Sequence, residues 1–182
     1  MKNFTSQNFK KYTGSPFNIS IATKNLIECV LVLEKHNIKG LLVFGTLLGI
    51  YRSGDLIPHD SDIDIAISHK DLNKLLGNCI DEFKEQGFEI LRYTKNTILS
   101  IGKDDNYIDL YIFTQKGNGA DMKCCVYTLN NNDFENSTIL NFKEKDFPTV
   151  NNPESFLENN YGKDWRIPIK GLSANPKKKK RK

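Results

Sequence analysis

Residues 62–68 read Asp-Ile-Asp-Ile-Ala-Ile-Ser, and this alternation of polar and apolar side chains is the strongest constraint on the fold. A period of two residues predicts a half-buried β-strand. Side chains alternate across a strand, so Asp62 and Asp64 lie on one face while the isoleucines turn toward the core. The sequence therefore predicts a sheet that holds two carboxylates side by side.

Two neighbouring carboxylates are costly unless something compensates them. At a separation of ~4 Å they repel by about 4 kcal/mol at an effective dielectric constant of 20. A divalent cation turns this repulsion into attraction, and ligands that are all oxygen atoms suit Mg²⁺ or Mn²⁺ rather than Zn²⁺. An Asp-x-Asp pair by itself is also common on solvated strand faces, so the metal interpretation depends on the neighbouring segments.

The segment before this strand resembles a phosphate-binding turn. Residues 41–44 form a short apolar run typical of a buried strand, and Gly45-Thr46 then opens a short helix that extends to Tyr51. Free backbone N–H groups and the helix dipole at such a turn attract phosphate. The glycine permits close approach of the backbone, and the threonine hydroxyl adds a donor.

A third acidic residue, Asp109, lies in the later apolar segment 107–113, which reads as another strand. If this strand pairs beside the Asp62 strand, the two acidic residues there gain a third partner. Three carboxylates on adjacent strands can hold two metal ions ~4 Å apart and assist phosphoryl transfer. The order of these features therefore favours a nucleotide-dependent transferase.

The 182 residues predict one compact α+β domain at residues 18–168. Residues 1–17 form a polar leader that we expect to be loosely ordered, and residues 169–182 a disordered basic tail. The pattern of apolar positions predicts helices at 20–38, 69–87 and 153–161, strands at 88–93, 97–101 and 124–129, and a loop at 130–132. Of the adjacent cysteines in the last strand, one is expected to be exposed.

The net charge of +4 is a property of the tail. Residues 177–182 carry six of the 26 basic charges, so the rest of the chain has 20 basic residues against 22 acidic ones. The charge sum therefore does not make the folded part a nucleic-acid-binding protein. The tail itself resembles a nuclear-import signal, and it could equally bind a polyanion such as RNA or acidic lipid headgroups, or serve as a solubilising end.

We expect a cytoplasmic protein, or a nuclear one if the source is a eukaryote or a virus of eukaryotes. The start of the sequence lacks the apolar core of a signal peptide, and no apolar run approaches the ~20 residues that span a bilayer. The four cysteines do not form a Cys-x-x-Cys motif, which argues against a zinc site.

Two blocks of sequence resemble the LicD/fukutin family of the polymerase-β-like nucleotidyltransferase superfamily. The first consists of Gly45-Thr46-Leu47-Leu48-Gly49, Arg52, Ile57-Pro58 and Asp60-Ser61-Asp62-Ile63-Asp64. The second consists of Pro153-Glu154-Ser155-Phe156-Leu157, Tyr161-Gly162-Lys163-Asp164-Trp165 and Pro168. The resemblance spans about residues 25–168.

The resemblance implies a nucleotidyltransferase-like mixed β-sheet flanked by helices. It also implies a transfer, dependent on Mg²⁺ or Mn²⁺, of a phospho-alcohol group from a CDP-activated donor to a sugar hydroxyl. Phosphocholine and ribitol phosphate are the donor groups of the family. By position, Asp62, Asp64 and Asp109 are the expected catalytic residues and metal ligands, and Asp60 joins this acidic cluster.

The resemblance assigns the remaining site residues to the activated donor. Gly45 and Thr46 are expected to hold its phosphate, and Arg52 to neutralise charge on the leaving nucleotide. His59 stands where the family usually has Trp, and it is either a donor-site or metal ligand, a proton carrier, or a packing residue. Asp109 is also expected to receive the acceptor proton. The aromatic residues Phe156, Tyr161 and Trp165 either stack on the nucleotide base or anchor the last helix.

Two alternatives remain open from the sequence. One is a nucleotidyltransferase that uses an NTP to modify RNA, a small molecule or a protein. The other is a catalytically silent nucleic-acid-binding module that keeps the fold and uses the basic tail as its contact. The complete set of candidate ligands favours an enzyme over the silent module.

Overall fold

The computed structural model describes residues 1–117, 119–169 and 174. Its strands are β1 (Phe4–Thr5), β2 (Gly40–Leu42), β3 (Ile63–Ser68), β4 (Glu89–Thr94), β5 (Ile98–Lys103), β6 (Asn106–Gln115), β7 (Asp121–Cys124), β8 (Tyr127–Asn130), β9 (Thr138–Phe142) and β10 (Lys145–Thr149). Its α-helices are α1 (Phe9–Gly14), α2 (Ile19–Lys35), α3 (Phe44–Ser53), α4 (Leu72–Lys74), α5 (Ile80–Glu85), α6 (Asn131–Glu135) and α7 (Pro153–Tyr161).

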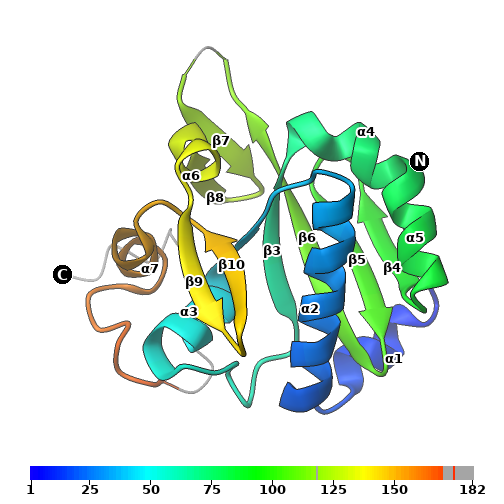
Figure 1. The fold of residues 1–182 in the computed structure, drawn as a ribbon, viewed down its shortest axis with the longest axis horizontal. Coiled ribbons are helices and arrows are strands. Elements are labelled where there is room, and N and C mark those ends of the chain that lie inside the picture. Colours follow the sequence, from blue (N-terminus) through cyan, green and yellow to red (C-terminus); the bar gives the residue numbers. More distant parts are fainter. Residues whose placement is uncertain (118, 170–173, 175–182) are drawn as a thin grey trace.

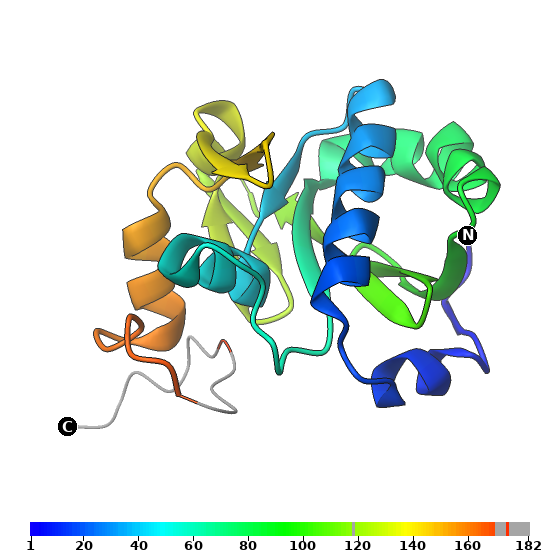
Figure 2. The same cartoon turned by 60° about the horizontal axis from the view of Figure 1, so that its bottom comes forward.

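The strands form one mixed sheet whose main path runs β1-β4-β5-β6-β3-β2-β10-β9, with the β7–β8 hairpin attached to β6. β3 pairs in parallel with β6 and antiparallel with β2, which places it in the middle of the sheet. Helix α2 crosses one face of this sheet, and α3 and α7 lie together near the β10–β9 side (Figures 1 and 2). The predicted mixed sheet flanked by helices is therefore confirmed.

All six residues of β3 are buried, so the strand is more enclosed than its half-buried pattern predicted. The apolar side chains of β3 belong to one core cluster that also contains Leu26 and Leu33 of α2. Asp64 is buried within this strand, at 7% exposure. The position of the strand between β2 and β6 thus forces a carboxylate into the interior of the domain.

The N-terminal segment differs from the expected loose leader. Its strand β1 pairs with β4, and its helix α1 buries Tyr12 against β5. A Cβ on Gly102 of β5 would stand 2.6 Å from the Tyr12 ring, so the glycine makes room for the aromatic side chain. The polar composition of residues 1–17 conceals this contact because Tyr12 is the only buried residue of the segment.

The expected helix at 69–87 is broken. A 3₁₀ turn at His69–Asp71, α4, a π-helical turn at Leu75–Cys79 and α5 follow one another, and Gly77 has non-helical backbone angles. The apolar face continues through the break because Leu72, Leu75 and Phe83 are all buried. The helical period therefore identified the buried face, and the interruption of the helix lies at Gly77.

The predictions match the structure least well in residues 121–149. The single strand expected at 124–129 is the β7–β8 hairpin, with Cys124 buried and Cys125 exposed, as predicted for the cysteine pair. The loop expected at 130–132 starts helix α6, which Asn130 caps. Strands β9 and β10 follow it, and they were not predicted.

The last helix matches its prediction. α7 begins after Asn152, whose side chain accepts a hydrogen bond from Ser155 N, and Gly162 follows its end. The proposed basic tail at 169–182 lies outside the described residues, apart from Ile169 and Ala174. No helix of the described ranges combines the length and apolar character that a membrane crossing requires.

Candidate active site

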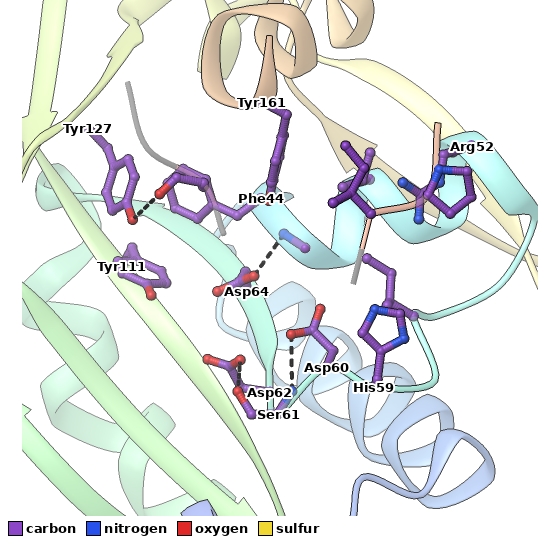
Figure 3. A pocket seen from close by; sticks show the side chains of 16 residues that line it. Phe44, Arg52, His59, Asp60, Ser61, Asp62, Asp64, Tyr111, Tyr127 and Tyr161 are labelled. Carbon is purple, nitrogen blue, oxygen red and sulfur yellow. Dashed lines mark hydrogen bonds between the residues drawn. The ribbon is translucent and has the colours of Figure 1, made fainter. Parts of the chain in front are cut away.

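The acidic residues gather at one end of the central strands, beside the start of α3. Asp64 and Asp109 are paired residues on the parallel strands β3 and β6, which confirms that the two strands are neighbours. Asp60 and Asp62 lie in the loop that enters β3. A cavity of about 300 Å³ opens beside them (Figure 3), lined by Phe44, Gly45, Leu48, Arg52, Ile57, His59, Asp60, Ser61, Asp62, Asp64, Tyr111, Tyr127, Tyr161, Pro168, Ile169 and Ala174.

The start of α3 holds Asp64 in place through two hydrogen bonds. Gly45 N donates to Asp64 Oδ2 at 3.0 Å, and Asp64 N donates to Thr46 Oγ1 at 2.8 Å. Thr46 is only 1% exposed and does not line the cavity. The Thr46 hydroxyl therefore positions the strand that carries Asp64, and the phosphate contact of Thr46 stays a prediction.

Gly45 leaves the space that the carboxylates share. A Cβ built on this residue would stand 2.4 Å from Asp60 Oδ2 and 3.3 Å from Asp64 Oδ2. Any larger side chain would displace the Asp60 carboxylate. The sequence signal for phosphate binding at Gly45 thus also marks the closest approach of the backbone to two acidic side chains.

Ser61 links the two carboxylates of the loop (Figure 3). Its backbone N–H donates to Asp60 Oδ1 at 3.0 Å, and its hydroxyl donates to Asp62 Oδ1 at 2.9 Å. Ser61 thus holds both acidic side chains in place at the cavity wall. Ser61 was not among the predicted site residues.

Burial and mutual repulsion raise the pKa values of the acidic cluster. Burial raises the pKa of Asp62 to about 7, and the nearby Asp109 and Asp60 carboxylates add to the shift. Burial raises the pKa of Asp64 well above its usual range, and the other three carboxylates contribute. The pKa of Asp60 is raised as well, chiefly by burial. The site therefore concentrates negative charge that a cation would stabilise.

Asp109 has a different environment, because a basic residue outside the sequence prediction pairs with it. Arg92 Nη2 lies 3.1 Å from Asp109 Oδ1 and 2.9 Å from Oδ2, and the Ser100 hydroxyl donates to Oδ1. Burial raises the Asp109 pKa, whereas Arg92 lowers it. Asp109 does not line the cavity, so its predicted roles as metal ligand and proton acceptor stay predictions.

Arg52 and His59 both line the cavity, on the side away from the tyrosines (Figure 3). Arg52 Nη1 donates to the carbonyl oxygen of Trp165 at 3.3 Å, which ties α3 to the segment after α7. Trp165 itself is 2% exposed, so it anchors this segment rather than offering a face to a base. Of the predicted aromatic residues, Tyr161 faces the cavity.

Aromatic side chains form the opposite wall, and most of them were not predicted. Phe44 packs against Tyr111 and Tyr127, with ring centroids 5.3 Å and 4.3 Å away, and against Phe156 at 5.7 Å. The backbone of Phe44 has φ of 45°, a left-handed conformation that is strained for a bulky residue. This conformation turns the chain from β2 into the first turn of α3, which contains Gly45. Strained backbone of this kind is typical of functional sites.

The donor set suits a hard divalent cation, since it offers carboxylate oxygens and no thiolate. Asp60, Asp62 and Asp64 fit this requirement because all three line the cavity, and Asp60 and Asp64 both approach Gly45. In their present orientations, however, no three His, Cys, Asp or Glu side chains of the described residues could hold a metal ion together. Binding therefore requires these carboxylates to turn from their protein donors toward the cavity.

The fold and this arrangement of carboxylates define a nucleotidyltransferase-type domain. Residues 37–153 match the family described as LicD/FKTN/FKRP, nucleotidyltransferase domain, and the chain belongs to this family. This result confirms the resemblance that the two sequence blocks carried. The antibiotic-resistance factor ANT(2'')-Ia has a similar fold, with a TM-score of 0.50 at 8% identity over 73% of this chain and 66% of that one.

Similar proteins share limited sequence with this chain. Ribitol-5-phosphate transferase FKTN of Homo sapiens is 28% identical over 168 residues, which cover 82% of this chain and 34% of the relative. The same protein of Macaca fascicularis matches equally well. An uncharacterized protein of Rickettsia typhi, RT0683, is 34% identical over 82 residues, or 45% of this chain and 25% of the relative. The chain spans about a quarter to a third of the length of these relatives.

Proposed function

We propose that this protein transfers a phospho-alcohol group from a CDP-activated donor to a hydroxyl of a sugar or glycan, with Mg²⁺ or Mn²⁺. The observation that carries the proposal is that Asp60, Asp62 and Asp64 line one cavity together with Arg52, with Asp60 and Asp64 both close to Gly45. Membership in the LicD/FKTN/FKRP family supports transferase chemistry, and the name of the FKTN relatives supports ribitol phosphate as one donor group.

Each part of the cavity has a task in this reaction. Asp60, Asp62 and Asp64 would hold the cation, which would withdraw charge from the donor phosphates when bound. The guanidinium of Arg52 would neutralise the leaving nucleotide, because it is fixed at the cavity wall by Trp165. Tyr111, Tyr127 and Tyr161 would exclude water and give the donor an aromatic surface to stack on.

Labelled donors test this proposal. The full chain is incubated with Mn²⁺, a mixture of glycan acceptors and either CDP-choline or CDP-ribitol, each labelled in the alcohol. We expect the label to move to a glycan, and we expect Asp64→Asn to abolish this transfer. Leu31→Ala is the matched control because Leu31 is exposed on α2, away from the cavity.

Parallel reactions with labelled NTPs separate the alternatives. Transfer of a nucleotide to RNA, a small molecule or a protein, with no movement of the alcohol label, would show a nucleotidyltransferase instead. No transfer of any label, together with binding of RNA, would favour the silent binding module. A cytoplasmic or nuclear location, and an import receptor for residues 177–182, remain separate predictions.

A further inference from the structure

We infer that Arg92 takes the place of a second metal ion, so that this site holds one divalent cation rather than two. The inference deepens the proposed function and rests on its use of a cation. The sequence predicts that Asp62, Asp64 and Asp109 hold a pair of metal ions. Asp109, however, already has the guanidinium of Arg92 beside it. A row of side chains leads from Arg92 to the cavity.

Paired residues on four neighbouring strands form this row. Arg92 of β4 pairs with Ser100 of β5, Ser100 pairs with Asp109 of β6, and Asp109 pairs with Asp64 of β3. Directly paired residues project from the same face of a sheet. The register therefore places a basic residue, a hydroxyl and two carboxylates in a line that ends at Gly45.

The contacts along the row neutralise Asp109. Arg92 reaches both carboxylate oxygens, and its Nε also donates to Ser100 Oγ at 3.0 Å. Ser100 in turn donates to Asp109 Oδ1, so hydroxyl and guanidinium hold one oxygen together. Asp109 is only 4% exposed, and a charge so deeply buried needs a partner. A metal ion at Asp109 would have to compete with this guanidinium for the same oxygens.

Arg92 is fixed from the other side as well. The register of β4 against β5 shifts between Ile90 and Arg92, and such a bulge re-aims the side chain that follows it. The ring of Phe9 in α1 lies against the guanidinium, with its centroid 4.8 Å from Arg92 Cζ. Thr5 of β1 pairs with Arg92, so the N-terminal segment covers this side of the row. Arg92 cannot leave Asp109 without breaking these contacts.

The remaining carboxylates of the site, which lie at the cavity, have no such partner. Within the described part of the chain, no basic side chain forms an ion pair with Asp60, Asp62 or Asp64. All three line the same cavity, and Asp60 and Asp64 both approach Gly45. The uncompensated charge thus lies at one position, which suits one divalent cation with Arg92 as the fixed positive charge behind it.

The test counts Mn²⁺ ions on the full chain by calorimetric titration and by electron paramagnetic resonance. We expect one Mn²⁺ per wild-type chain, without the spin coupling that two ions ~4 Å apart would show. Asp64→Asn should weaken binding at least about tenfold. The neutral replacement of the pair, Arg92→Gln with Asp109→Asn, should leave the affinity little changed, because it removes no ligand and keeps the net charge.

The single change Arg92→Gln exposes the Asp109 carboxylate, and we expect it to admit a second Mn²⁺. Arg166→Gln is the matched control, since Arg166 forms an ion pair with Glu154 at 2.6 Å on the surface. Thermal unfolding of each variant shows whether it is folded, and the wild-type count decides the question even if a variant is not.

Three results would overturn the inference. These are two coupled Mn²⁺ ions on the wild-type chain, a double variant that loses Mn²⁺ as Asp64→Asn does, and a wild-type chain that binds no Mn²⁺ at millimolar concentration. The count does not depend on the donor or the acceptor. One bound Mn²⁺ without transfer of any CDP-alcohol would therefore refute the proposed function and leave this inference standing.

Discussion

At the scale of the residue, the site depends on one missing side chain. Gly45 allows Asp60 and Asp64 to approach the start of α3, and its N–H binds Asp64. Thr46, the next residue, supports the same carboxylate from behind through the backbone of β3. Two adjacent small residues thus set the position of the acidic cluster, one by leaving space and the other by a buried hydrogen bond.

Gly45→Ala should separate cation binding from folding. Gly45 lies in α3 without a positive φ, so alanine suits its backbone, and the flexible Asp60 carboxylate can swing away from the new methyl group. We expect the free energy of unfolding to change by less than about 1 kcal/mol. We expect Mn²⁺ affinity to fall by about tenfold or more.

Calorimetric titration measures the affinity, and chemical denaturation measures the stability. Gly14→Ala is the control, because a Cβ there meets no atom within 4 Å. Unchanged Mn²⁺ affinity in Gly45→Ala would show that the cation does not bind over this glycine.

The raised pKa of Asp62 predicts how pH affects the metal-free protein. The folded chain keeps a proton on Asp62 up to a pH of about 7, whereas the unfolded chain releases it near the ordinary pKa of 3.8. Stability from this group is therefore present at low pH and is lost as the pH rises through this window. Asp62→Asn removes this titration. The melting temperature of the variant should therefore rise relative to that of the wild type as the pH increases from 4 to 8.

Mg²⁺ should act in the opposite direction, because it binds the deprotonated carboxylates. The rise in melting temperature on adding Mg²⁺ should therefore be larger at pH 8 than at pH 6. Thermal unfolding with and without Mg²⁺ checks both effects. A wild-type protein that gains stability over Asp62→Asn as the pH rises, without metal, would contradict the first.

At the scale of the element, local patterns predicted what a single segment determines. The alternation in residues 62–68 and the cap, proline and glycine around 153–162 were sufficient for β3 and α7. β9 and β10 were missed because only Phe142, Phe147 and Thr149 of the pair are buried, too few to show a period. Arg92 was missed for another reason, since its role depends on the pairing of four strands.

The N-terminal segment supplies the prediction at this scale. Tyr12 of α1 is 5% exposed and lies against Gly102 of β5, and its burial raises its pKa to about 12. Tyr12→Ala should lower the free energy of unfolding by about 3 kcal/mol, as other buried aromatic residues do. Thr13→Ala on the exposed side should change it by less than about 0.5 kcal/mol.

Chemical denaturation followed by fluorescence measures both variants. A loss below about 1 kcal/mol for Tyr12→Ala would mean that α1 does not contribute a stable part of the core. Gly102, next to the end of β5, is the sequence signal that could have indicated this contact, because glycine in a strand often marks the close approach of another group.

At the scale of the whole molecule, positive and negative charge occupy different parts of the chain. The net charge of +4 combines six basic residues at 177–182 with an excess of two acidic residues in the remainder. The acidic cluster at Gly45 belongs to that remainder, and anionic ligands would be repelled from it unless a cation is bound. A polyanion is therefore expected to bind at the tail and not at the cavity.

Removing residues 177–182 tests this separation of charge. If all six basic residues contact single-stranded RNA, the logarithm of the affinity should fall with the logarithm of the salt concentration with a slope of about −4. The shortened chain should lose this affinity and keep its melting temperature and Mn²⁺ binding, because the carboxylates of the cavity are unchanged. A chain of full length with glutamine at the six positions is the matched control, since it removes the charge and keeps the length. RNA affinity that persists in both variants at moderate salt would place the contact on the folded domain, and the acidic cluster would then have to lie away from it.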